Sequence, residues 1–139
     1  MSGVVYDVQA ALVAVLRSDA DVKAALGDPA RIYDVPPREV ITPLVVVEAA
    51  ESRPVPADGG GLEEHIFTLR LLSKYQGAAE VRAAQAAMAA VIETSSLLVS
   101  GATVINQQVR YRDCFRGRDG RSQQGVMRIR IVTEQESEA

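Results

Sequence analysis

Hydrophobic and polar residues alternate most regularly in the last third of the chain. Two alternating segments, Ala102–Arg116 and Ser122–Thr133, flank the turn Arg118-Asp119-Gly120-Arg121. An Asp-Gly pair in this position is typical of a β-hairpin, because glycine adopts the positive φ that the turn needs. The pattern predicts an antiparallel hairpin with one apolar face, whose members are Ile105, Val109, Tyr111, Phe115, Met127, Ile129 and Ile131.

Helical spacing of apolar residues predicts three helices. The first extends over Val5–Leu16, and a short second one over Ala20–Leu26. Ser18 or Asp19 is suited to cap the second helix, and Gly27 is suited to end it. The third and most regular helix is predicted over Gly77–Glu93, where many alanines allow close packing on a sheet.

Further extended segments are predicted over Ile32–Val35, Leu44–Ala50 and Glu63–Tyr75. The continuous apolar run Leu44–Val47 favours a strand covered on both faces. Between the last two segments, Glu51–Gly61 is predicted to be a long mobile loop, because several of its residues disfavour both helix and strand. These residues are Pro54, Pro56, Asp58, Gly59, Gly60 and Gly61.

Helices and strands follow one another without regular β-α-β alternation, which indicates the α+β class. We expect a mostly antiparallel sheet of four to five strands, with an N-terminal helix and one long Ala-rich helix packed on it. Residues 1–134 are expected to form a single domain, and residues 135–139 a frayed acidic tail.

The composition narrows the class of function. The formal net charge of −3 argues against a strongly basic nucleic-acid binder, and an aromatic content of 4% argues against a stacking platform for single strands. The single cysteine excludes an intramolecular disulfide and is typical of a reducing compartment. Neither a signal peptide nor an apolar run of the ~20 residues needed for a membrane span is present.

Candidate catalytic and metal-binding chemistry is sparse. Cys114 and His65 could form a nucleophile–base pair, but an incidental strand cysteine is the simpler interpretation. One His and one Cys exclude a Cys/His zinc site, and the carboxylates that remain for another metal site are scattered along the chain, at Asp34, Glu48 and Glu51. The run Gly59–Gly61 leads into Glu63 and a strand, whereas a phosphate-binding loop leads into a helix.

Arginine residues form the one marked cluster of a single residue type in the sequence. The hairpin holds seven of the 15 basic residues, and the alternation predicts that five of them form a row on one face: Arg110, Arg112, Arg116, Arg128 and Arg130. Three interpretations follow: a solvated sheet face, a contact with an acidic protein surface, or binding to the DNA backbone.

With these segments in order, the chain resembles the tail-completion proteins of long-tailed bacteriophages and gene transfer agents, also called tail terminators or head-to-tail joining proteins. The similar stretches are Val8–Leu26, Arg31–Pro36, Pro43–Val47, His65–Leu69, Ala78–Ala90, Phe115–Gly120 and Gly125–Arg130.

The resemblance implies a structural, non-enzymatic role without a cofactor or a metal. Proteins of this kind form a homo-oligomeric, typically hexameric ring that caps the tail tube, ends its polymerisation and joins it to the head–neck connector. The implied partners are further copies of the chain, the major tail tube protein and the connector or stopper protein. DNA passes only as cargo and no membrane is involved. The protein would act in the host cytoplasm during assembly and then in the particle tail.

On this interpretation, the arginine row and the loop residues Pro54, Pro56 and Asp58–Gly61 are candidate contacts between subunits or with partners. Three alternatives stay open. The first is another neck ring component, such as a connector or stopper. The second is a small ligand-binding regulatory module, for which the sequence shows no convergent polar groups. The third is an enzyme, for which it shows no paired acids or activated nucleophile.

Overall fold

The computed structural model describes residues 4–56, 60–74 and 77–135. The helices are α1 (Val4–Ser18), α2 (Ala20–Leu26) and α3 (Ala79–Thr94). The strands are β1 (Ile32–Tyr33), β2 (Leu44–Pro54), β3 (Leu62–Ser73), β4 (Ala102–Arg116) and β5 (Gln123–Gln135). In the part of the chain that is described, no helix is long and apolar enough to cross a membrane.

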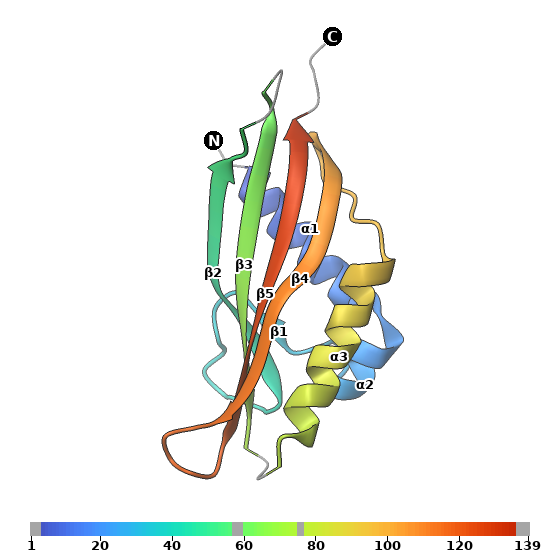
Figure 1. Cartoon of the computed structure of the whole chain (residues 1–139). Helices are drawn as coiled ribbons and strands as arrows, with labels where there is room; N and C mark the ends of the chain where they lie inside the picture. The colour runs from blue at the N-terminus through green and yellow to red at the C-terminus, as the bar shows by residue number, and fades with distance from the viewer. Residues whose placement is uncertain (1–3, 57–59, 75–76, 136–139) are drawn as a thin grey trace.

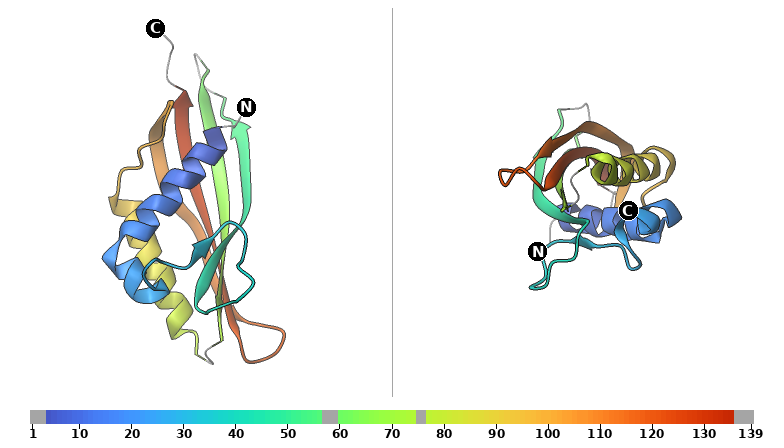
Figure 2. Two further views of the ribbon diagram at one scale, coloured as in Figure 1. Left: turned by 180° about the vertical axis from the view of Figure 1, so that it is seen from behind. Right: turned by 90° about the horizontal axis from the view of Figure 1, so that it is seen from below.

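The strands form one five-stranded sheet in the order β1-β2-β3-β5-β4. Only the short β1 runs parallel to its neighbour, and the other pairs are antiparallel. Figures 1 and 2 show the three helices on one face of the twisted sheet, with the other face bare. The predicted α+β class, with an N-terminal helix and the alanine-rich helix packed on a mostly antiparallel sheet, is confirmed.

The core lies between the helices and the covered face of the sheet. Alternate residues of the central strands point into it, because side chains of a strand alternate between faces. Helix stripes with 3.6-residue spacing meet them. The large, fully buried side chains include Leu12, Leu16, Leu26, Phe67, Leu69, Leu71, Met88, Ile92, Met127 and Ile129. Each contributes roughly 1.5–3 kcal/mol by burial.

The short helix α2 begins and ends as predicted. The Asp19 carboxylate accepts hydrogen bonds from the backbone N–H groups of Asp21 and Val22, both at 3.0 Å, so Asp19 rather than Ser18 is the N-cap. Gly27 closes the helix with φ of 91°, a conformation that suits glycine. The chain then reaches β1 at the sheet edge.

The predicted loop Glu51–Gly61 is shorter in the structure. β2 continues to Pro54, and the Val55 N–H donates to the Leu62 carbonyl at 3.0 Å, so Glu51–Pro54 are strand residues. Proline is tolerated there because β2 is a free edge beyond its short pairing with β1. Gly60 and Gly61 adopt positive φ, whereas Asp58 and Gly59 lie outside the described residues. At the other end, Gln135, the first residue of the predicted tail, closes β5.

The bare face corrects a second expectation. Leu44–Val47 is predicted to be covered on both faces. Val45 and Val47 face the helices, and on the other face Leu44 is buried whereas Val46 is only half-buried. The apolar run is therefore covered on both faces at its start, at Leu44, and on one face only at Val46.

Two β-bulges in β4 overturn the predicted single row of arginines. The register with β5 shifts between Val104 and Asn106 and again between Val109 and Tyr111. Each bulge adds one residue and reverses the alternation beyond it. Val109 therefore lies opposite the buried Ile129, whereas Tyr111 lies opposite the exposed Arg128. Ile105, Tyr111 and Phe115 are exposed and do not belong to the core.

Candidate interaction surfaces

The bare face of the sheet carries Arg128 and Arg130, and both are engaged within the chain. Arg130 forms an ion pair with the buried Glu64, which also binds Arg53 at 2.7 Å. The hydrogen bonds from Arg130 and Arg53 hold the pKa of Glu64 below its ordinary value, so this carboxylate stays ionised at neutral pH. The Arg128 guanidinium lies 5.4 Å from the centre of the Tyr111 ring.

A second ion pair completes the pattern on this face. Arg70 binds Glu48 at 2.5 Å and donates to the Gln124 side chain at 3.0 Å. The bare face is thus a network of paired charges across β2, β3 and β5. Arg130 is therefore paired within the chain, whereas the exposed Arg128 belongs to none of the ion pairs found among the described residues. A contact between these arginines and an acidic partner stays a prediction.

The remaining hairpin arginines differ from these two. Arg112 and Arg116 have the parity of Cys114 and lie on the helix-facing side, while Arg110 sits in the second bulge. None of the ion pairs found among the described residues involves Arg110, Arg112, Arg116, Arg118 or Arg121. Together with Arg128, these are the exposed hairpin guanidinium groups that lie outside ion pairs in the described part of the chain. Arg116 donates a hydrogen bond to the Gly120 carbonyl at 3.4 Å.

The hairpin turn projects beyond the rest of the sheet (Figures 1 and 2). Asp119 fixes it, because its Oδ1 accepts hydrogen bonds from Arg121 N, Ser122 N and Ser122 Oγ, all at 2.9 Å. These bonds lower the pKa of Asp119. Gly120 provides the positive φ of 74°. These hydrogen bonds therefore hold the backbone of the turn, which carries Arg118 and Arg121, in one conformation.

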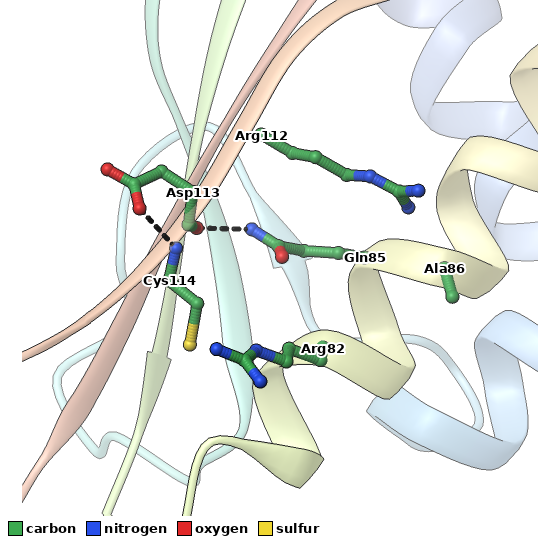
Figure 3. Close-up of a pocket in the computed structure, with 6 residues that line it drawn as sticks. All are labelled: Arg82, Gln85, Ala86, Arg112, Asp113 and Cys114. Carbon is green, nitrogen blue, oxygen red and sulfur yellow. Dashed lines mark hydrogen bonds between the residues drawn. The ribbon is translucent and has the colours of Figure 1, made fainter.

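A cleft of about 460 Å³ separates α3 from β4 (Figure 3). Arg82, Gln85 and Ala86 line it from the helix, and Arg112, Asp113 and Cys114 from the strand. The Asp113 carboxylate points away, and it accepts hydrogen bonds from Cys114 N at 2.7 Å and Tyr111 Oη at 2.9 Å. The charged groups left in the cleft are two guanidinium groups.

Gly125 on β5 allows Gln85, which lines this cleft, to approach the sheet closely. A Cβ at this position would come within 2.6 Å of Val81 Cγ1 and 2.7 Å of Gln85 Nε2. Because glycine has no Cβ, the buried Gln85 reaches the sheet and donates to the Asp113 carbonyl at 2.7 Å. The hydrogen bond joins α3 to the edge strand and places Gln85 between the two arginines (Figure 3).

His65 and Cys114 do not meet. His65 pairs with Ile131 and Cys114 with Gly125, six residues apart along β5 and on opposite sides of it, so roughly 20 Å of sheet separates them. His65 Nδ1 bonds Ser52 Oγ at 2.7 Å and Nε2 bonds Thr133 Oγ1 at 2.9 Å. The nucleophile–base hypothesis is therefore wrong, and His65 is a buried structural residue whose pKa is lowered by burial, with Glu63 opposing.

The carboxylates considered for a metal site, Asp34, Glu48 and Glu51, do not come together as a group of metal ligands either. Glu48 is paired with Arg70, and Asp34 accepts a hydrogen bond from Gln9 at 3.2 Å. Within residues 4–56, 60–74 and 77–135, no group of three or more His, Cys, Asp or Glu side chains is placed to hold a metal ion.

The two edges of the sheet expose large apolar side chains. Beside β1, the segment 34–43 carries Val35 and Ile41, which are 77% and 61% exposed. At the opposite edge, Leu98 before β4 and Ile105 in its first bulge are 89% and 53% exposed. Both edges of the sheet therefore carry large apolar side chains that are exposed to solvent.

A family model described as tail completion protein gp17 matches residues 10–134 of the chain. The chain belongs to this family. No curated protein is similar enough in sequence to match it. The family assignment confirms the resemblance drawn from the sequence and supports a structural role in the tail of a phage or gene transfer agent particle.

A solved structure has the same fold as this tail completion family member. It is a chain of the particle titled "Virion of native gene transfer agent (GTA) particle", with a TM-score of 0.85 and 22% sequence identity. The match covers 96% of this chain and 99% of that one. The two chains therefore share one fold over nearly their full lengths.

Sequence reasoning did not identify the cleft of this family member. Arg82 and Gln85 lie within the predicted third helix, and Gly125 lies within the return strand of the predicted hairpin, but no site is predicted at these residues. Two signals were available: a long polar residue within a buried stripe, and a glycine inside an alternating strand, which often marks a close approach of another element.

Proposed function

We propose that this protein is the tail terminator of a phage or gene transfer agent particle. In this role it forms a closed ring on the end of the tail tube, ends tube polymerisation and joins the tail to the head–neck connector. The ring is expected to be hexameric. The protein would act in the host cytoplasm during assembly and then stay in the neck of the particle.

The proposal of a ring rests on one observation. The two sheet edges expose different large apolar side chains, Val35 and Ile41 on one side and Leu98 and Ile105 on the other. A contact between unlike surfaces of identical chains repeats in one direction and closes into a ring when the rotation permits. Family membership supports placing such a ring in a tail.

The arginine-rich hairpin fits the partner side of this role. Its turn projects from the sheet and carries Arg118 and Arg121 outside any ion pair among the described residues. Such a projection is suited to contacting an acidic surface on the tube protein, the connector or a neighbouring copy. DNA would pass as cargo, because the net charge of −3 does not favour tight phosphate binding.

The test is addition of the purified protein to growing tubes of the major tail protein from the same particle. We expect shorter tubes, each with an annulus at one end in negative-stain images, and a sixfold mass for the isolated annulus by light scattering. Tubes of unchanged length and without caps would contradict the proposal. If the protein instead bound only the head portal complex, it would be another neck component, such as a connector or stopper.

A further inference from the structure

We infer that the cleft between α3 and β4 is a docking site for the acidic segment 134–139 of a second copy of this chain. The inference rests on the proposed function in one respect, since it requires a neighbouring copy in the assembly. The cleft supplies the Arg82 and Arg112 guanidinium groups, and the segment supplies the carboxylates of Glu134, Glu136 and Glu138.

The cleft has the chemistry of a carboxylate site. Arg82 from α3 and Arg112 from β4 lie on either side of Gln85 (Figure 3). Neither arginine belongs to an ion pair among the described residues. Two guanidinium groups on separate rigid elements favour planar, bidentate recognition of carboxylates.

The local acids do not neutralise this pair. Asp113 is turned away and engaged by Tyr111 and the Cys114 backbone N–H. Glu80, one turn before the cleft on α3, accepts a hydrogen bond from Ser73 at 3.0 Å. Glu93 lines the adjoining groove with Arg110 and Arg112, and it forms no ion pair with Arg112 among the described residues. The cleft itself therefore keeps a local positive charge on a chain whose net charge is −3.

The segment 134–139 carries negative charge that complements the two arginines of the cleft. Its sequence, Glu-Gln-Glu-Ser-Glu-Ala, contains three carboxylates and no basic residue. β5 ends at Gln135, at the opposite end of the sheet from the hairpin turn (Figure 1).

The same copy cannot fill its own cleft with this segment. The cleft residues Arg112 and Cys114 lie opposite Met127 and Gly125, eight to ten residues before Gln135 on β5. That distance is roughly 26–33 Å along a strand, whereas residues 136–139 span at most about 14 Å. The donor of the carboxylates is therefore a second copy.

The first experiment uses the full chain labelled with ¹⁵N and a synthetic peptide of residues 133–139. At low salt we expect chemical-shift changes at the Arg82 and Arg112 Nε–H groups and the Gln85 side-chain amide. High salt should abolish these changes, because exposed ion pairs are screened. A peptide with glutamine in place of its three glutamates is the control. No shift at these groups, or equal shifts with the control peptide, would overturn the inference.

The second experiment exchanges the charges. R82E with R112E, or E136R with E138R, should raise the concentration needed for assembly by roughly tenfold. Combining all four substitutions should restore assembly, since each new pair has the opposite polarity. K23E with K74E, at sites outside the cleft and outside the proposed contact surfaces, is the matched control for net charge. Circular dichroism of each variant checks that the fold is intact.

The outcomes separate this inference from the proposed ring. If R82E with R112E assembles as readily as the unaltered chain, the docking site is wrong and the ring stands. If the unaltered chain never assembles or caps tubes, the ring is wrong, and the peptide experiment alone decides whether the cleft binds the acidic segment.

Discussion

At the scale of single residues, His65 makes stability depend on pH. It is the only histidine, it is fully buried, and both ring nitrogens are hydrogen-bonded. Burial places its folded-state pKa below the ordinary 6.5, so between these two values the unfolded chain binds more protons than the folded one. Stability is therefore complete above about pH 6.5 and falls as the pH decreases through this window.

Urea unfolding at a series of pH values measures this effect. The slope below pH 6.5 is expected to be at most one proton, about 1.4 kcal/mol per pH unit. H65Q can still bond Ser52 and Thr133 but does not titrate, so its unfolding free energy should be flat in this window. An equal slope in H65Q would show that another group is responsible.

The ionisation of Glu64 makes stability depend on pH in a second, more acidic range. Its pKa is held below the ordinary 4.5 by Arg130 first and Arg53 second, so this contribution is lost as the pH falls below about 4.5. E64Q leaves the partly buried Arg130 without its carboxylate and should lower the free energy of unfolding by about 1–3 kcal/mol.

The matched control for Glu64 is Glu48. Its pair with Arg70 is more exposed, with side-chain accessibilities of 46% and 34%. E48Q should therefore change stability by less than about 1 kcal/mol. Equal losses in the two variants, measured by denaturant unfolding at pH 7, would contradict the assigned importance of the Arg53–Glu64–Arg130 network.

At the scale of elements, Gly125 sets how closely α3 approaches the sheet. G125A introduces a Cβ against Val81 and Gln85, both within 2.7 Å, and should destabilise the protein by about 1–3 kcal/mol. G77A is the control, because the nearest atom to its Cβ would be 4.0 Å away. Thermal unfolding compares the two, and a similar melting temperature for both variants would show that α3 moves without penalty.

The elements were largely predictable from the sequence, and the hairpin shows the limit. Its strand boundaries and Asp-Gly turn could be predicted from alternation and turn residues, which are local properties. The two bulges in β4 could not be predicted in this way, because packing against β5 and α3 decides where a bulge forms. A one-residue bulge leaves the extended segment intact but reverses which side chains face the core, so Tyr111 and Phe115 were assigned to the wrong face.

At the scale of the whole molecule, the proposed ring requires two unlike edges. V35D with I41D removes the two exposed apolar side chains beside β1, and L98D with I105D removes those beside β4. Each double variant should fail to form rings, because every copy then lacks one half of the contact.

Mixing the two variants tests the direction of the contact. One intact interface remains between unlike variants, so the mixture should yield heterodimers and no rings in sedimentation velocity. Y6D, at a side chain that is 63% exposed on α1, is the control and should assemble normally. Assembly that is blocked by only one of the two double variants would indicate a contact between like edges instead.

Local patterns in the amino-acid sequence were enough to predict the α+β class, the three helices, the terminal hairpin and the tail completion family. The class, the helices and the hairpin depend on spacing along the chain, because apolar periodicity and turn residues act locally. The family comes from the resemblance of whole sequence stretches to tail-completion proteins. Which arginines are free depends instead on tertiary packing: Glu64 and Tyr111 engage Arg130 and Arg128, and the bulges turn Arg112 towards α3. Pairing between distant segments sets these environments, so no local pattern could have separated the engaged arginines from the free ones.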